Sequence, residues 1–131
     1  MNLLLDTHIF LWSMLEPERL SKKVSVELQK QENQLWFSPI SSWEIMLLEK
    51  KRKLILYPDP ATWLREAFKR VPIREARISH DIAIQSCLIK LPHQDPADRL
   101  LAATAVIYGL TLVTSDTRLI QSKVCKVLKN K

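Results

Sequence analysis

Four acidic side chains occupy positions at which a carboxylate can take part in chemistry. Asp6 ends the first predicted strand, and Asp116 lies just beyond a late predicted strand. In open parallel sheets, ligands bind outside the carboxyl ends of the strands, so these two aspartates can face one crevice. Asp98 and Glu44 fall near the starts of two predicted helices, where the helix dipole keeps a carboxylate ionised. We therefore expect these four residues to form one acidic site.

Such a site would require a divalent cation. Four carboxylates that are crowded together repel one another strongly unless a cation neutralises them. Magnesium prefers carboxylate oxygens and water molecules in octahedral geometry. One or two ions would orient a water molecule, lower its pKa and hold a scissile phosphate in line for attack. The four acids thus indicate metal-dependent hydrolysis of a phosphodiester.

The first two of these four acids, Asp6 and Glu44, also have structural interpretations. Asp6 is of a residue type that is favoured at the N-cap of a helix, and a helix is predicted to follow it. Ser41 and Glu44 have the spacing of a capping box. However, Ser38-Pro39 is the stronger helix start, and it would leave Glu44 in the second turn without a capping role.

The later acids have structural interpretations as well. Asp95-Pro96 pairs a favoured N-cap with proline at the first helical position, so Asp95 is better interpreted as a cap than as a metal ligand. Asp98 would then be the third helical residue, where an acid simply complements the helix dipole. Asp116 also suits a turn after the preceding strand. The joint placement of the four acids, and not any one of them, favours a site.

The chain alternates short apolar runs with helical stretches, a pattern that is typical of a layered α/β domain. The predicted strands are residues 2–6, 35–37, 71–73, 110–114 and 124–128. Pro72 restricts the third of these to an edge of the sheet. The predicted helices are residues 7–15, 21–31 and 38–50, one beginning at Asp59-Pro60, one beginning at Ser79, and one from Asp95-Pro96 to the terminating Gly109.

The composition excludes several classes of protein. Gly109 is the only glycine, whereas a P-loop or a dinucleotide-binding fingerprint needs several. Cys87 and Cys125 lack the spacing of metal ligands, which argues against a structural zinc site and indicates a reducing, cytoplasmic compartment. We expect neither a signal peptide nor a membrane-spanning segment. We expect a single domain over residues 1–131, with a basic, frayed tail at about residues 123–131.

The net charge of +6 favours an anionic partner such as a nucleic acid. An acidic site in a basic protein is explained if the acids bind a divalent metal and the basic surface attracts a phosphate substrate. The basic residues that could guide RNA are Lys50, Lys51, Arg52, Lys53, Lys123, Lys126, Lys129 and Lys131. A run of basic residues is more often simply a solvated surface.

The aromatic and histidine side chains suggest further contacts. A partner protein could contact the four tryptophans, Trp12, Trp36, Trp43 and Trp63, although core packing is the more common role. His8 and His93 could contact substrate, although local hydrogen bonding is more usual.

Four motifs appear in a specific order along the chain. They are Leu3-Leu4-Leu5-Asp6-Thr7-His8, Ser42-Trp43-Glu44-Ile45, the run from Asp95 to Ala105 (DPADRLLAATA), and Leu112-Val113-Thr114-Ser115-Asp116. This ordered set resembles the PIN domain, and specifically the VapC-type toxins of bacterial toxin–antitoxin pairs. The resemblance runs from about Asn2 to Leu119 or beyond, nearly the whole chain.

The resemblance implies a three-layer α/β/α fold on a mostly parallel sheet of about five short strands. It implies an endoribonuclease that depends on Mg²⁺ or Mn²⁺, and it assigns the metal to the same four acids, Asp6, Glu44, Asp98 and Asp116. It makes Asp95 an accessory acid, and Thr114 or Ser115 a source of a hydroxyl group. Arg99 would hold a site acid or a phosphate, with a surface ion pair as the alternative. The resemblance further implies a cognate antitoxin and a homodimer.

Other functions remain open at this point. Phosphoryl transfer through an aspartyl-phosphate ranks lower, because Asp6-Thr7-His8 lacks the second acid of an Asp-x-Asp motif. A second alternative is a non-catalytic relative that binds RNA or protein. The presence of all four acids argues against it, because a protein without catalytic activity would be free to lose one of them. A non-toxin nuclease of RNA processing also fits the motifs. The sequence names neither the RNA target nor the number of metal ions.

Overall fold

A parallel sheet of five short strands organises the computed structural model, which describes residues 1–92 and 94–131. The strands are β1 (Asn2–Leu5), β2 (Gln34–Phe37), β3 (Ile73–Glu75), β4 (Thr111–Thr114) and β5 (Val127–Lys129). Their order is β3-β2-β1-β4-β5, and every neighbouring pair is parallel. The prediction of about five short strands is confirmed. His93 lies outside the described residues.

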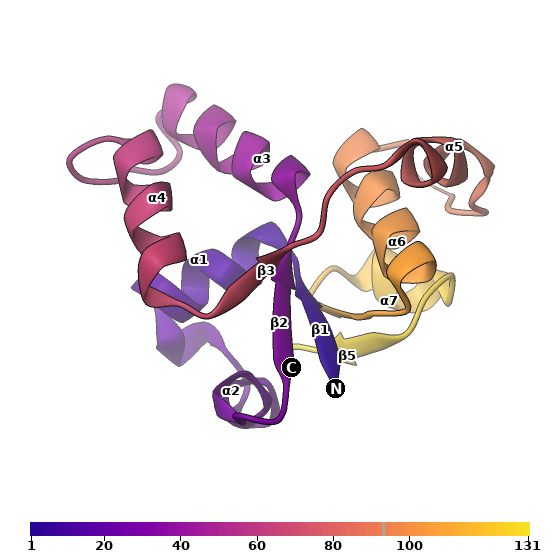
Figure 1. The fold of residues 1–131 in the computed structure, drawn as a ribbon, viewed down its shortest axis with the longest axis horizontal. Helices are drawn as coiled ribbons and strands as arrows, with labels where there is room; N and C mark the ends of the chain where they lie inside the picture. Colours follow the sequence, from indigo (N-terminus) through magenta and orange to yellow (C-terminus); the bar gives the residue numbers. More distant parts are fainter. Residues whose placement is uncertain (93) are drawn as a thin grey trace.

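Helices cover both faces of the sheet. Figure 1 shows α1 (Thr7–Leu15), α2 (Lys22–Gln29), α3 (Pro39–Lys50) and α4 (Pro60–Arg70) on one side. On the other side lie α5 (His80–Leu88), α6 (Pro96–Tyr108) and α7 (Thr117–Ser122). A short 3-10 helix, η1 (Pro17–Arg19), joins α1 to α2. The three-layer α/β/α architecture is therefore confirmed.

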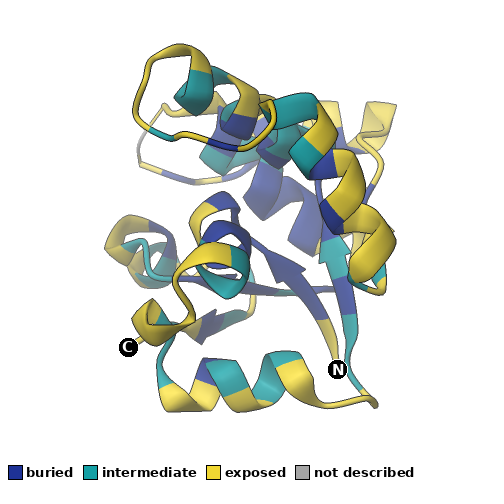
Figure 2. Cartoon of the chain, turned by 90° about the vertical axis from the view of Figure 1, so that its left-hand side faces the viewer, coloured by how far each residue is buried: buried dark blue, intermediate teal, exposed yellow. Residues whose placement is uncertain are grey.

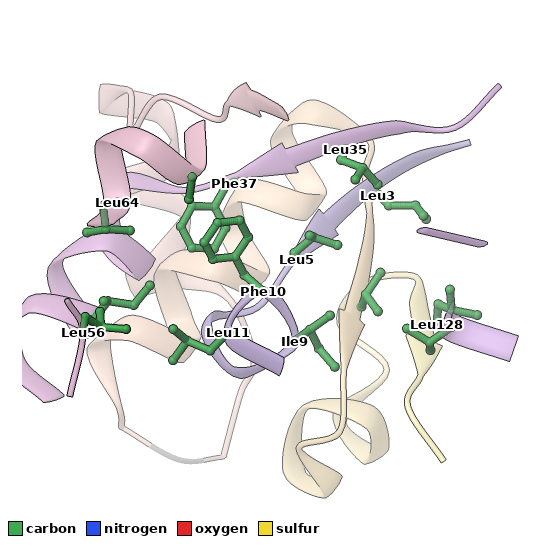
Figure 3. Close-up of a cluster of buried hydrophobic side chains, with 14 residues drawn as sticks. Leu3, Leu5, Ile9, Phe10, Leu11, Leu35, Phe37, Leu56, Leu64 and Leu128 are labelled. Atoms are coloured by element: carbon green, nitrogen blue, oxygen red, sulfur yellow. The ribbon is translucent and has the colours of Figure 1, made fainter. Parts of the chain in front are cut away.

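Successive strand residues alternate between two apolar cores, because side chains of a strand point to opposite faces in turn. Leu3 and Leu5 pack into one core with Phe10 and Phe37, under α1, α3 and α4 (Figure 3). Leu4 packs into the other core, with residues of α6 and α7. Figure 2 shows that the strands are mostly buried, while the outer helix faces are exposed. Burial on both faces explains why β1 reads as an uninterrupted run of leucines.

Side-chain caps start the helices where the sequence predicted them. Ser21, Ser38, Asp59, Ser79 and Asp95 each accept a hydrogen bond from a backbone N–H of the helix that follows. Gly109 ends α6 in the left-handed region, with φ of 67°, which glycine adopts without a steric penalty. The local chemistry of caps therefore fixes where α3 and α6 begin.

Three features differ from the sequence prediction. The third strand covers Ile73–Glu75 and begins after Pro72, because proline has no N–H to donate; it does lie at the sheet edge as predicted. Helix α7 and η1 were not predicted, since both are short. The tail is not frayed: β5 pairs with β4, and the side-chain Oδ1 of Asn130 accepts a hydrogen bond from the Ser21 N–H at 2.6 Å.

No helix in the described part of the chain is both long enough and apolar enough to cross a membrane.

Phe10→Ala is expected to lower the free energy of unfolding by about 3–5 kcal/mol, because it empties a site in the larger core. The Phe10 side chain is 1% exposed, and its ring centroid lies 4.3 Å from that of Phe37. Urea denaturation measures the loss. Ile84→Ala, at a position of α5 that is 59% exposed, is the control and should change stability by less than about 0.5 kcal/mol. Equal losses in the two variants would contradict this view of the core.

Candidate active site

Five acidic residues line one open pocket of about 460 Å³. Asp6 and Asp116 follow the carboxyl ends of β1 and β4, Glu44 lies on α3, and Asp95 and Asp98 lie at the start of α6. The structure thus places in one pocket the four residues that the sequence singled out, together with Asp95. Ser115, one of the two residues predicted to supply a hydroxyl group, also lines the pocket.

The order of the strands explains why the pocket forms here. β1 lies between β2 and β4, so the chain leaves β1 towards one half of the sheet and returns later to the other half. The crevice at such a switch point is the usual ligand site of an open parallel sheet. Leu5 is in register with Val113, and the Asp6 N–H donates to the Val113 carbonyl at 3.1 Å. Asp6 and Asp116 therefore leave neighbouring strand ends.

Asp6 is held at both of its carboxylate oxygens. Its Oδ1 accepts from the Ile9 N–H at 2.9 Å, which makes Asp6 the N-cap of α1. Its Oδ2 accepts from the Thr114 hydroxyl at 2.5 Å. The Thr114 oxygen in turn accepts from the Asp116 N–H at 3.0 Å. The hydroxyl group of Thr114 therefore links the two strand ends that carry Asp6 and Asp116.

Glu44 is positioned by a different helix. The Thr7 hydroxyl donates to Glu44 Oε1 at 2.5 Å, which ties α3 to the start of α1. Ser38 is the N-cap of α3, and its Oγ accepts from the Ile40 N–H at 3.1 Å. Glu44 therefore has no part in a capping box, and its carboxylate reaches the pocket.

Two arginines that sequence reasoning did not single out also line the pocket. The Arg118 guanidinium lies 3.6 Å from one carboxylate oxygen of Asp98 and 3.6 Å from one of Asp116. The Arg19 guanidinium lies 4.3 Å from the centroid of the Trp12 ring. Arg118 had a weak sequence signal, two residues after Asp116, whereas Arg19 reaches the pocket only through the turn that η1 makes. These cations are suited to attract a phosphate.

Arg99 has a structural role that the motif did not reveal. Its guanidinium donates to the main-chain carbonyls of Ser86, Ile89 and Leu91 at 2.8–2.9 Å, and to that of Cys87 at 3.4 Å. The carbonyls of Ser86 and Cys87 lie at the C-terminal end of α5, where a helix leaves its carbonyls without partners, and those of Ile89 and Leu91 follow it in the chain. Arg99 is absent from the described lining of the pocket. Its predicted role in holding an acid or a phosphate stays a prediction.

Burial makes the negative charge of the pocket costly. The pKa of Asp6 is raised above its usual value of 3.8, mainly because the side chain is withdrawn from water, although the hydrogen bond from Thr114 opposes the shift. The pKa of Glu44 is also raised, first by burial, and then by the charges of Asp98 and Asp95. Both shifts indicate that a cation would stabilise the ionised pocket.

The donor set fits a hydrated divalent cation. Carboxylate and hydroxyl oxygens are the ligands that Mg²⁺ and Mn²⁺ favour. Within residues 1–92 and 94–131, no three acidic, histidine or cysteine side chains converge on one point closely enough to enclose an ion. Mg²⁺ does not need such a cage, because it keeps several of its water molecules and binds through one or two carboxylates.

Comparisons with known proteins agree with this geometry. The model of the PIN domain family matches residues 3–126. Ribonuclease VapC22 of Mycobacterium tuberculosis is 34% identical over 121 residues, which cover 90% of this chain and 89% of that protein.

Solved structures of other proteins share the fold. The structure of VapBC2 from Rickettsia felis, bound to a DNA fragment from their promoter, contains a chain with a TM-score of 0.75 and 17% identity over the full length of both chains. A toxin–antitoxin complex from Klebsiella pneumoniae contains one with a TM-score of 0.67 and 24% identity, over 96% of this chain and 95% of that chain. At such identities the likeness concerns the fold alone.

Asp6→Asn is expected to stabilise the metal-free protein relative to the wild type, by an amount that grows as the pH rises from the unfolded pKa of 3.8 through the raised folded value. Because the pKa of Asp6 is raised in the folded state, its favourable contribution is fully present below the unfolded value of 3.8 and is lost as the pH rises through the folded value. Asparagine does not titrate, and it still suits the N-cap of α1. Urea denaturation in the presence of a chelator measures the difference between variant and wild type.

The control for this series is Asp81→Asn, which removes an exposed carboxylate of α5 outside the pocket. If the stability difference between Asp6→Asn and the wild type did not change with pH, the burial of the Asp6 charge would not be destabilising the folded protein, and the prediction would be wrong.

Proposed function

This chain belongs to the PIN domain family, and we propose that it is a metal-dependent endoribonuclease that hydrolyses RNA phosphodiester bonds. One observation carries the proposal. Asp6, Glu44, Asp98 and Asp116 come from separate segments of the chain and line the same pocket at the switch point of the sheet. The similarity to Ribonuclease VapC22 supports RNA as the substrate. We take residues 1–131 to be one nuclease domain.

The carboxylates of Asp6, Glu44, Asp98 and Asp116 would hold Mg²⁺ or Mn²⁺. When bound, such an ion supplies a water of lowered pKa and offsets the charge of the scissile phosphate. Thr114 and Thr7 keep Asp6 and Glu44 oriented, because each hydroxyl donates to one carboxylate oxygen. Asp95, as the N-cap of α6, fixes the backbone that carries Asp98, whose N–H donates to it at 3.4 Å.

The cationic side chains at the pocket have a complementary role. Arg118 lies between Asp98 and Asp116. The paired N–H groups of an arginine match the two free oxygens of a phosphodiester, so the Arg118 guanidinium can leave a carboxylate and bind the phosphate of the substrate. The stacked Arg19 provides a second positive charge at the same opening.

We also propose that the enzyme acts as the toxin of a toxin–antitoxin pair and that a cognate antitoxin neutralises it. The similar solved structures include a complex described as toxin–antitoxin and several VapBC pairs, which supports a protein partner of this kind. The homodimer that the family resemblance implies stays a prediction, and so does a cytoplasmic location.

Asp98→Asn is expected to lower RNA cleavage by about a hundredfold or more, the scale of losing one preorganised charge at a reacting centre. The fold should persist, because asparagine is nearly the same size and Asp98 is only partly buried. The measurement is cleavage of labelled total RNA by the purified protein with Mg²⁺ or Mn²⁺, and again with a chelator. Circular dichroism confirms that the variant is folded.

Asp81→Asn removes an acid outside the pocket and should cut RNA at the wild-type rate. Cleavage by Asp98→Asn at the wild-type rate would exclude the assigned site. Cleavage that continues in the chelator would exclude the metal.

Induced expression of the wild type is expected to stop bacterial growth, while Asp98→Asn should leave growth intact, because toxicity would require the cleavage of cellular RNA. Co-expression of the cognate antitoxin should restore growth. Growth curves and plating efficiency measure both effects. Unimpaired growth with active wild-type enzyme would contradict the toxin role and favour a nuclease of RNA processing.

A further inference from the structure

A second groove continues directly from the acidic pocket. Its volume is about 430 Å³, and its lining shares His8, Glu44 and Asp95 with the acidic pocket. One wall is α3, which contributes Trp43 and two leucines, and the other is the start of α6. Lys51 and Lys53, just beyond the end of α3, complete the lining. We call this feature the α3–α6 groove.

Trp43 is the unusual residue of the groove, because 54% of its surface is exposed. The other tryptophans have partners: Trp12 lies under Arg19, Trp36 stacks on Tyr108, and Trp63 packs on Phe10. Within the described residues, Trp43 has no ring–ring or cation–ring contact. The exposed part of the Trp43 side chain is therefore available to a ligand in the groove.

The two lysines of the groove are placed by an ordered backbone. The Lys51 N–H donates to the Leu47 carbonyl at 2.9 Å, and the Lys53 N–H donates to the Leu48 carbonyl at 2.9 Å. These bonds close the C-terminal end of α3, with Arg52 in the left-handed region at φ of 59°. The lysines therefore project from a fixed turn. The groove is acidic where it joins the pocket and basic at Lys51 and Lys53.

We propose that the α3–α6 groove binds an unpaired nucleotide of the RNA next to the bond that is cut. This inference rests on the proposed ribonuclease function. The base stacks on Trp43, and the backbone phosphate beside it contacts Lys51 and Lys53. Stacking of a base on an aromatic side chain requires a free base face, which a duplex does not offer.

The lysines favour RNA over a protein as the occupant. Lysine is depleted in protein–protein interfaces, whereas lysines beside an exposed aromatic are the usual components of a single-strand binding surface. Continuity with the acidic pocket gives the same result, because a strand whose phosphate lies at the acids must leave the pocket by an adjoining groove. A second copy of this chain and a protein partner are the competing occupants.

The test is the binding of a fluorescein-labelled, mixed-sequence RNA oligonucleotide, measured by anisotropy as a single strand and as a duplex. All variants carry Asp98→Asn, so that the probe survives. Trp43→Ala is expected to weaken binding of the single strand about tenfold, within the range for loss of one stacking platform. Trp43→Phe should restore most of the affinity. Lys51→Ala with Lys53→Ala should weaken binding and reduce its salt dependence.

Two controls match these variants outside the groove. Tyr57→Ala removes an aromatic side chain that is 80% exposed, and Lys22→Ala with Lys23→Ala removes two exposed lysines of α2. Both controls should bind the single strand as the parent does. Light scattering should give the same mass for Trp43→Ala as for the parent.

The outcomes separate this inference from the proposed function. If the wild type cleaves RNA but Trp43→Ala binds the single strand as tightly as the parent, the groove is not a nucleotide site, although the nuclease stands. If Trp43→Ala changes the oligomeric mass, the groove is an interface between copies and the inference fails. If the wild type cleaves no RNA, the proposed function fails first. A selective loss of single-strand binding in Trp43→Ala supports the groove whatever the rate of cleavage.

Discussion

The pairing of β1 with β4 is the constraint on which the site depends. It sets Leu5 beside Val113, and it brings the Thr114 hydroxyl to the carboxylate of Asp6. A slip of one residue would reverse every side chain of β1, so that Leu4 would exchange faces with its neighbours and the bond to Thr114 would be lost. The two separate apolar cores oppose such a slip. Packing of the leucines therefore holds the acids in register.

The acids stabilise the fold and form the site at once. Asp6, Asp95 and Asp116 are each the N-cap of a helix, and each uses one oxygen to accept backbone N–H groups. The partial positive charge of a helix N-terminus favours the ionised carboxylate before any cation binds. Burial acts against it, as the raised pKa of Asp6 shows. A capping role and a role in the pocket are therefore compatible, although the sequence presents them as alternatives.

Most of the fold could be predicted from local sequence signals, whereas contacts between distant segments could not. Ser38-Pro39 and Asp95-Pro96 carry their helix starts in two adjacent residues, so α3 and α6 could be placed from sequence. The four acids could be chosen because they follow strands or open helices. Nothing local indicates that Arg99 donates to the carbonyls of Ser86 and Ile89, or that Arg19 reaches the pocket. Those positions depend on how α5 and η1 pack.

Helix α3 connects the chemistry of the acidic pocket with the shape of the neighbouring groove. Trp43 and Glu44 are consecutive, so they project from the helix axis about 100° apart and face different sides of the same wall. Glu44 is fixed by Thr7, while Trp43 keeps an open ring in the groove. Any tilt of α3 would move both side chains together. A ligand that settles on Trp43 therefore meets Glu44 in a fixed relation, which couples the choice of substrate to the placement of a candidate metal ligand.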